Sequence, residues 1–380
     1  MAMFAPTILG TAEPPIPAAR QWASRYDGAQ GPALDLTQAV PGYPPHPEML
    51  RRLGEAASRA DLAGYGAIEG DLALREALAE DLSLLYGGTV GADEVAITAG
   101  CNLAFAMVMK VLAAPGDNVL IPTPWYFNHE MALRMAGVEA RPLPCEADAG
   151  FLPDPDRAES LLDGRSRAIL LVTPNNPTGA VYPPEIIAAF QELCERRGIT
   201  LVVDETYRDF LDTRPHELFA EGRDFVHLYS FSKAYCIPGH RLGAVASTAA
   251  FQEQLRKALD TLQICPARPG QAALSWAIPS LREWRAGNRR IMGGRAQACR
   301  EALSSHRIDA MGAYFAYLRL PRSAPDAVEA ARLLAERNGL LVLPGPFFGP
   351  GQERHLRLAF ANAEAERLGE LPKRLLWAEA

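Results

Sequence analysis

Short runs of apolar, often β-branched residues recur along the middle of the chain, and a helix-length segment separates each run from the next. The seven runs are Val95–Thr98, Asn118–Ile121, Val138–Pro142, Ala168–Thr173, Thr200–Asp204, Val226–Ser230 and Ala244–Ser247. Short β-branched runs in this alternation are typical of strands that are buried on both faces of a parallel sheet. The pattern predicts an α/β fold with a seven-stranded, mostly parallel sheet covered by helices.

The pattern changes after Trp284. A long Arg-rich helix is followed by the apolar run "AYFAYLRL", a helix from Pro325 to Asn338, and the runs "LLVLPG" and "HLRLAFA". This order predicts a second, smaller α+β domain. A chain of 380 residues is long enough for two domains. We expect a large domain over residues 46–284 and a small domain over residues 285–380. The Pro-rich, irregular segment 1–45 is expected to join the small domain.

Composition and charge exclude several classes of function. The chain is 48% hydrophobic and 22% charged with a net charge of −7, so it lacks the basic surface that nucleic acids and anionic membranes attract. No apolar run reaches the ~18–20 residues of a membrane span, and the Pro-rich N-terminus shows no secretory signal. The six cysteines form no CxxC pair. We therefore expect free thiols, no metal site, and a cytoplasmic protein.

Ligands of such sheets bind beyond the carboxyl ends of the strands, so the residues that follow each run are the candidates for chemistry. Gly100, Cys101 and Asn102 follow the first run and open a helix without a nearby acidic residue. Free N–H groups at a helix start bind anions such as phosphate, although a plain tight turn explains this segment equally simply. A GxGxxG fingerprint is absent from the chain, which disfavours dinucleotide binding.

Two further strand ends carry polar side chains. Asn175 and Asn176 stand in a Pro-flanked turn that ends at Gly179, and their amides could hold a ligand oxygen or simply shape the turn. Asp204 ends a buried run, with Tyr207 three residues later. Asp204 could cap the next helix, or its carboxylate could pair with a cationic ligand nitrogen.

Lysine is scarce, and one lysine lies at a strand end. The chain has four: Lys110, Lys233, Lys257 and Lys373. Only Lys233 follows an apolar strand, in the segment "SFSK", and Arg241 lies eight residues beyond it. A desolvated lysine lowers its pKa and forms Schiff bases, while arginine and serine hydroxyls bind phosphate. A phosphate cradle, a carboxylate, a phenol, an amide and an amine at the ends of one sheet together suit pyridoxal phosphate.

The motifs "YGAIEGDLALREAL", "TAGCNLAF", "PGDNVLIPTPWY", "TPNNPTG", "VVDETY", "SFSKAYCIPGHRLG" and "RLAFAN" occur in this order over nearly the whole chain. The chain resembles the class I/II aminotransferases, which are fold-type I pyridoxal-phosphate enzymes. The resemblance implies an aspartate-aminotransferase-like fold. It also implies pyridoxal 5′-phosphate as cofactor, an α-amino acid and a 2-keto acid as substrates, and a homodimer with shared active sites.

The resemblance also implies roles for single residues. Lys233 would form the Schiff base with the cofactor and move the proton, and Asp204 would keep the pyridine nitrogen protonated. The remaining cofactor contacts would come from Asn176 and Tyr207 at the ring oxygen, Tyr126 stacked on the ring, and Gly100, Cys101, Ser230, Arg241 and the second subunit's Tyr65 at the phosphate. Arg357 would bind the substrate carboxylate, with Asn176 and Ala39 beside it.

Departures from the family pattern leave some points open. Ala39 stands where the family usually has glycine, His240 stands where it often has an aromatic residue, and Cys101-Asn102 replace a hydroxyl residue in the cradle. Arg268, in a loop that lies near the neighbouring active site in relatives, could bind a second substrate carboxylate or simply lie at the surface.

The motif set favours amino-group transfer but also occurs in enzymes with other reactions on this fold. One alternative is a lyase or another non-transaminating enzyme that acts on amino acids by elimination, cyclisation or oxidation. Another is a non-catalytic pyridoxal-phosphate-binding sensor module. Such modules are usually fused to a DNA-binding domain, and no basic helix-turn-helix pattern is visible before residue 45.

Overall fold

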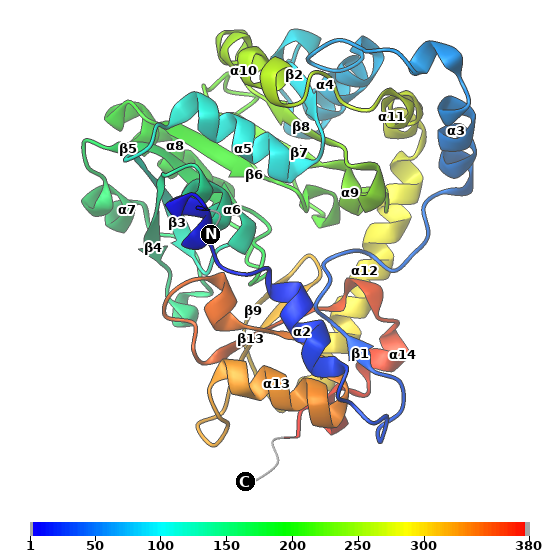
Figure 1. Cartoon of the computed structure of the whole chain (residues 1–380), viewed down its shortest axis with the longest axis vertical. Coiled ribbons are helices and arrows are strands. Elements are labelled where there is room, and N and C mark those ends of the chain that lie inside the picture. Colours follow the sequence, from blue (N-terminus) through cyan, green and yellow to red (C-terminus); the bar gives the residue numbers. More distant parts are fainter. Residues whose placement is uncertain (1–2, 377–380) are drawn as a thin grey trace.

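A computed structural model describes residues 3–376, and its largest element is a seven-stranded sheet (Figure 1). In spatial order the strands are β2 (Val95–Thr98), β8 (Gly243–Ala246), β7 (Val226–Ser230), β6 (Thr200–Asp204), β5 (Ser166–Val172), β3 (Asn118–Thr123) and β4 (Glu139–Pro144). Only β8 runs against its two neighbours, and the four other pairs are parallel. The seven predicted runs therefore form one mostly parallel sheet, as expected.

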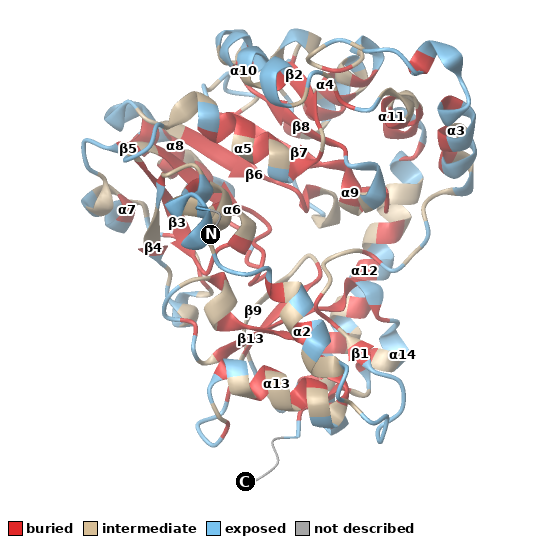
Figure 2. Ribbon diagram, viewed as in Figure 1, coloured by how far each residue is buried: buried red, intermediate tan, exposed pale blue. Residues whose placement is uncertain are grey.

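Helices cover both faces of this sheet. Along β5, Leu170 packs with α5 (Cys101–Leu112), α6 (Phe127–Met135) and α10 (Ala249–Leu262), while Leu171 packs with α8 (Pro184–Arg197) on the opposite face. Successive side chains of a strand point to opposite faces, so a run that is apolar throughout must be covered twice. Figure 2 shows the strands of this sheet buried beneath their helices.

The other helices fall into two groups. On the large sheet or beside it lie α3 (Pro47–Ala57), α4 (Leu72–Tyr86), α7 (Pro155–Leu161), α9 (Phe231–Ala234) and α11 (Arg268–Ser280). Around the second sheet lie α2 (Pro15–Ala23), α13 (Ala327–Asn338), α14 (Ala365–Leu368) and α15 (Leu371–Arg374). The long helix α12 (Arg282–Ala302) runs from the first group to the second (Figure 1).

The second sheet has four antiparallel strands and its own apolar core. Its strands are β12 (Leu343–Pro344), β13 (His355–Ala359), β10 (Phe315–Arg319) and β9 (Arg307–Gly312). The two ends of the chain meet beside it, because β1 (Leu34–Asp35) pairs in parallel with β11 (Leu340–Leu341). The smaller α+β unit built from both chain ends is therefore confirmed, while the boundaries at 45/46 and 284/285 stay a prediction.

One expectation for the N-terminal segment was wrong. Residues 1–45 are not irregular throughout, because they contain the helix α2 and a single turn, α1 (Pro6–Leu9). Pro15 and Pro17 stand in the first turn of α2, where a missing backbone N–H costs nothing because that turn has no intrahelical acceptor. Ala19, on the inner face of this helix, is fully buried.

Within residues 3–376, no helix combines the length and the apolar character needed to cross a membrane. All six cysteines are free thiols.

Candidate active site

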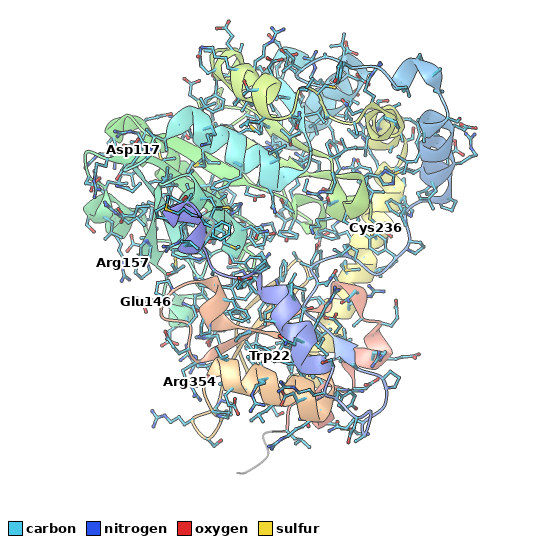
Figure 3. The ribbon with its side chains drawn as sticks, viewed as in Figure 1. Trp22, Asp117, Glu146, Arg157, Cys236 and Arg354 are labelled. Carbon is cyan, nitrogen blue, oxygen red and sulfur yellow. The ribbon has the colours of Figure 1, made fainter. Side chains whose placement is uncertain are left out.

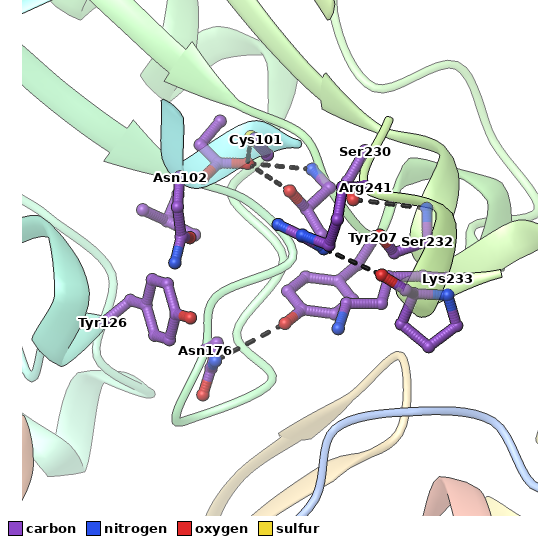
Figure 4. Close-up of a pocket in the computed structure, with 13 residues that line it drawn as sticks. Cys101, Asn102, Tyr126, Asn176, Tyr207, Ser230, Ser232, Lys233 and Arg241 are labelled. Carbon is purple, nitrogen blue, oxygen red and sulfur yellow. Dashed lines mark hydrogen bonds between the residues drawn. The ribbon is translucent and has the colours of Figure 1, made fainter. Parts of the chain in front are cut away.

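The carboxyl ends of the large sheet enclose a cavity of about 140 Å³, shown in Figure 4. Its lining contains eight residues to which the resemblance gives a role: Cys101, Tyr126, Asn176, Asp204, Tyr207, Ser230, Lys233 and Arg241. It also contains Asn102, Val172, Thr206, Ser232 and Pro238. Parallel strands bring their carboxyl ends to one edge of a sheet, which is why residues up to 140 positions apart converge here.

Lys233 lies in the short helix α9, directly after β7, and is partly buried. Its Nζ donates a hydrogen bond to the carbonyl oxygen of Ala39 at 2.9 Å. Burial, aided by the positive charge of Arg241, lowers the pKa of Lys233 to about 8. The three other lysines are exposed. Lys233 is thus the lysine of this chain that is set up to react as a neutral amine near neutral pH.

Asp204 ends β6 and is 4% exposed. Its Oδ1 accepts hydrogen bonds from the Thr206 amide at 3.0 Å and from the Thr206 hydroxyl at 2.7 Å, and its Oδ2 lies 3.2 Å from His129 Nε2. Burial raises the pKa of Asp204, but the His129 contact and the Thr206 hydrogen bonds outweigh it and leave the pKa below its usual value. The cavity therefore holds a buried, ionised carboxylate.

His129 is the site residue that sequence reasoning missed. It stands on α6, is 2% exposed, and packs its ring against Phe105 and Tyr126 at centroid distances of 4.4 and 5.2 Å. A lone histidine on the apolar face of a helix is more often a core residue than a functional one. Its position three residues after Tyr126 was the only available signal.

Another part of the site combines groups that suit an anion. Gly100 has φ 91° and precedes α5, whose first turn carries no acidic side chain. A Cβ on Gly100 would lie 2.2 Å from Nη2 of Arg241, so the guanidinium rests directly against the start of this helix. Ser230 is the N-cap of α9 and lines the same cavity. Helix N–H groups, a guanidinium and a hydroxyl together are the donors that phosphate prefers.

Arg357, on β13 of the second sheet, reaches the edge of the site through Asn176. Its Nη1 donates to Asn176 Oδ1 at 3.2 Å, and its Nη2 donates to the carbonyl oxygen of Thr37. Asn176 Nδ2 in turn donates to Tyr207 Oη at 3.4 Å (Figure 4). Arg357 is 2% exposed, and burial lowers its pKa to about 10. No group of the described residues accepts from its Nε, so the guanidinium retains capacity for an anion.

Gly100, Ala39 and Arg357 lie next to the cavity lining without forming part of it, and three further residues of interest lie outside the cavity. Tyr65 is 82% exposed and does not line it. Arg268 is partly buried, with its Nε 3.2 Å from Asp71 Oδ1 and its Nη1 donating to the carbonyl of Asp61 at 2.7 Å. His240 is exposed beside Arg241. The structure of one chain thus brings neither Tyr65 nor Arg268 to the site.

The groups at the cavity fit pyridoxal phosphate. That molecule carries a phosphate, a basic ring nitrogen, a ring oxygen and an aldehyde. The cavity offers an anion site at Arg241, a carboxylate at Asp204, amide and phenol donors at Asn176 and Tyr207, and an amine at Lys233. The Gly100 contact strengthens this fit, because a larger residue would displace the guanidinium from the anion site.

Comparisons with known proteins agree with the geometry. Residues 32–375 match the family model described as "Aminotransferase class I and II". The aromatic aminotransferase ISS1 of Arabidopsis thaliana is 29% identical over 90% of this chain and 88% of its own length. The aspartate/prephenate aminotransferase of Thermus thermophilus is 30% identical over 87% of this chain and 88% of its own length.

A solved structure shows the same architecture. A mutant of Thermus thermophilus aspartate aminotransferase superposes with a TM-score of 0.91 and 25% identity, covering 99% of this chain and all of that one. The family match spans most of the chain and includes both sheets. The chain therefore belongs to the class I and II aminotransferases, a family of pyridoxal-phosphate-dependent enzymes.

Proposed function

We propose that this aminotransferase holds pyridoxal 5′-phosphate in the cavity at the ends of the large sheet, bound covalently through Lys233. It then moves an amino group between an α-amino acid and a 2-keto acid. The observation that carries the proposal is that Lys233, Asp204 and Arg241 line one cavity. The aldehyde of this cofactor requires an amine, its ring nitrogen requires a carboxylate, and its phosphate requires a positively charged group.

The cofactor contacts follow from the donors and acceptors at each corner. Arg241, Ser230 and the backbone at Gly100 and Cys101 would hold the phosphate. Asp204 would keep the ring nitrogen protonated, a role that its low pKa suits. The ring would also contact Asn176 and Tyr207 through its oxygen and Tyr126 through its face. When bound, pyridoxal phosphate supplies an aldehyde for the amino group and a cationic ring that accepts electron density from the substrate Cα.

Lys233 would carry out the proton transfers. A general base works best when its pKa is near the working pH, and the pKa of about 8 at Lys233 meets that condition where an ordinary lysine does not. Its hydrogen bond to the Ala39 carbonyl ties the amine to the N-terminal segment. Once the substrate amino group has displaced it, the Lys233 amine would take the proton from the substrate Cα and return it to a neighbouring atom.

The substrate carboxylate would bind at Arg357. A guanidinium is planar and can meet a carboxylate with two parallel hydrogen bonds, which a lysine cannot do. Asn176 and the Thr37 carbonyl hold the guanidinium in place. The family leaves the rest of the substrate open, because one relative above is named for aromatic substrates and the other for aspartate and prephenate.

We also propose a homodimer in which Tyr65 of the partner subunit reaches the phosphate. Gly66 N donates to Cys265 Sγ at 3.4 Å, so the loops that contain Tyr65 and Ile264 lie side by side. These loops and their flanks expose four large apolar side chains: Tyr65, Leu72, Leu262 and Ile264. Exposed apolar groups that gather at one place mark interaction surfaces. A cytoplasmic location is a further proposal, supported by the free thiols.

A screen of amino donors against 2-keto acids tests the proposed reaction. Each donor is mixed with the holoenzyme, first alone and then with pyruvate or 2-oxoglutarate, and the products are separated. Transfer predicts a new amino acid in amounts equal to the new keto acid. Release of ammonia or a thiol without a new amino acid would favour the lyase alternative and contradict the proposal.

A further inference from the structure

A second and larger cavity, of about 560 Å³, lies beside the candidate active site. Its floor is aromatic and apolar, formed by Trp125, Phe127, Met131 and Phe347. Four prolines, a glycine and two alanines complete its walls, and three glutamates stand among them. It lies between the N-terminal segment before α2, helix α6, and the loop that follows β12.

One pair of consecutive residues lies where the two cavities meet, and a second pair lies between the second cavity and Arg357. Trp125 lines the second cavity, whereas Tyr126 lines the first. Phe347 lines the second cavity, whereas the ring of the adjacent Phe348 lies 5.3 Å from the guanidinium carbon of Arg357. The Trp125 amide donates to the Phe348 carbonyl at 2.8 Å and ties the two pairs together. The second cavity therefore adjoins the proposed carboxylate end of the substrate site.

The N-terminal wall of this cavity is held in place by aromatic packing. Trp22, which Figure 3 places on α2, stacks on Phe347 with ring centroids 6.4 Å apart and planes 22° apart. Ala19 is fully buried in a cluster with Phe127, Leu343 and Phe348. The cavity is thus a feature of the folded chain, because α2 anchors the segment that closes it.

The charge of this cavity has one sign. Glu13, Glu130 and Glu353 line it, and no lysine, arginine or histidine does. Glu130 pairs with Arg134 at 2.7 Å. Within the part of the chain that the structure describes, Glu13 and Glu353 form no ion pair, and both are exposed. Two uncompensated carboxylates at an apolar cavity repel an acidic group and attract a cationic one.

We propose that this cavity takes the side chain of the amino substrate and selects a large side chain that is apolar along its length and carries no negative charge. The inference rests on the proposed function. An aromatic floor stabilises apolar and aromatic groups by burial and also attracts a cationic terminus. The exposed carboxylates of Glu13 and Glu353 strengthen the attraction for a cation. An acidic side chain would lose its hydration and meet charges of its own sign.

Arg268, the one basic residue that the sequence offered for a second carboxylate, already has an acidic partner in its own chain. Its guanidinium is engaged by Asp71 and by the Asp61 carbonyl, and it lines neither cavity. In this chain Arg268 links the start of α11 to Asp61 and Asp71, on either side of Tyr65.

The test uses two carboxylic acids that lack an amino group and cannot react. 3-Phenylpropionate presents an aromatic side chain, and glutarate presents a second carboxylate. Isothermal titration of the holoenzyme should show 3-phenylpropionate binding at least ~10-fold more tightly than glutarate. Burial of the aromatic ring increases the affinity, whereas the second carboxylate of glutarate is repelled. Equal or tighter binding of glutarate would overturn the inference.

Variants locate the preference in this cavity. Glu13→Gln combined with Glu353→Gln removes two exposed charges and should strengthen glutarate binding about two- to tenfold, leaving 3-phenylpropionate nearly unchanged. The matched control is Glu253→Gln, because Glu253 is an exposed glutamate of α10 that lines neither cavity; this variant should change the affinity for neither acid. An unchanged glutarate affinity in the double variant would contradict the assignment.

Phe347→Ala provides the complementary change. The affinity for 3-phenylpropionate should fall by about tenfold, because part of the aromatic floor is lost. The affinity for glutarate should change little, because the Arg357 site is retained. A melting curve checks that α2 stays docked. Parallel losses for both acids in a folded variant would contradict the inference. These titrations require no amino transfer, so their outcome is separate from that of the donor screen.

Discussion

Nε2 of His129 lies 3.2 Å from Oδ2 of Asp204, and both side chains are buried. The other oxygen of Asp204 is occupied by Thr206. In a buried site such a contact is strong, because little water competes for the charge. His129 thus stabilises the ionised form of Asp204, on which the proposed protonation of the cofactor ring depends.

Replacing His129 by phenylalanine keeps a ring against Phe105 and removes the hydrogen bond. The loss of a hydrogen bond to a charged group costs about 1.5–3 kcal/mol, so kcat/KM should fall roughly ten- to a hundredfold. Burial raises the pKa of Asp204 and His129 lowers it, so the pKa should rise when His129 is lost. The acid limb of the pH profile of kcat/KM should therefore move to higher pH. The matched control is His306→Phe, in the part of the chain around the second sheet.

A double-mutant cycle separates this role from simple packing. If His129 acts through Asp204, then His129→Phe should cost little in an Asp204→Asn background, which already lacks the charge. Asp204→Asn alone should lower kcat/KM by about 10²–10³-fold while Lys233 still binds the cofactor. Additive losses in the double variant would show that His129 acts by another route.

The pKa of about 8 at Lys233 predicts how cofactor uptake depends on pH. The neutral amine is the reactive form, so the rate at which the cofactor-free protein bonds to pyridoxal phosphate should be half-maximal near pH 8 and level off about one pH unit higher. An ordinary lysine would not level off below about pH 10. Stopped-flow absorbance measures this rate, and Lys233→Ala should lack the fast phase. A rate that still climbs at pH 10 would contradict the lowered pKa.

Arg357→Lys keeps the positive charge and loses the planar pair of donors. The Michaelis constant for the amino acid should rise roughly ten- to a hundredfold, because one bidentate, charge-assisted contact becomes a single one. The cofactor content of the purified variant should equal that of the wild type, since Arg357 does not line the cofactor cavity. A variant that loses cofactor instead would place Arg357 in a different role.

Gly100→Ala should weaken cofactor binding by displacing Arg241. The new Cβ would meet Nη2 of Arg241 at 2.2 Å on a backbone with φ 91°. Gly116 has a similar φ of 95° with open space around it, so Gly116→Ala reproduces the backbone strain without the clash. Both variants should lose about 1–3 kcal/mol of stability. Only Gly100→Ala should raise the dissociation constant for pyridoxal phosphate, and equal effects would argue against the proposed phosphate site.

Much of the fold could be predicted because the large sheet is buried on both faces. Its strands are continuous apolar runs, and such runs are visible without tertiary information. The helix α2 could not be recognised in the sequence, because prolines such as Pro15 and Pro17 are typical of loops as well as of the first turn of a helix. Strand β9 (Arg307–Gly312) was also missed, because its "RIDAMG" sequence is polar and only half-buried.

Site residues at strand ends could be predicted from the sequence, whereas those brought in by helix packing could not. Lys233, Asp204 and Asn176 could be predicted because they follow strands, and the ends of parallel strands meet in space whatever the loops do. His129 could not, since its contact with Asp204 depends on how α6 packs on the sheet. The partner of Arg268 could not be predicted either, because Asp71 is 197 residues away in the sequence. Long-range side-chain pairs of this kind leave no local pattern.

Reduction of the purified enzyme with borohydride, followed by peptide mapping, is the sharpest test of the proposed site. Borohydride fixes the cofactor to the amine that holds it, and the chain offers only four lysines. A pyridoxyl group on the peptide that contains Lys233, and on no other, is the predicted result. A label on Lys110, Lys257 or Lys373, or no label in an active preparation, would contradict it.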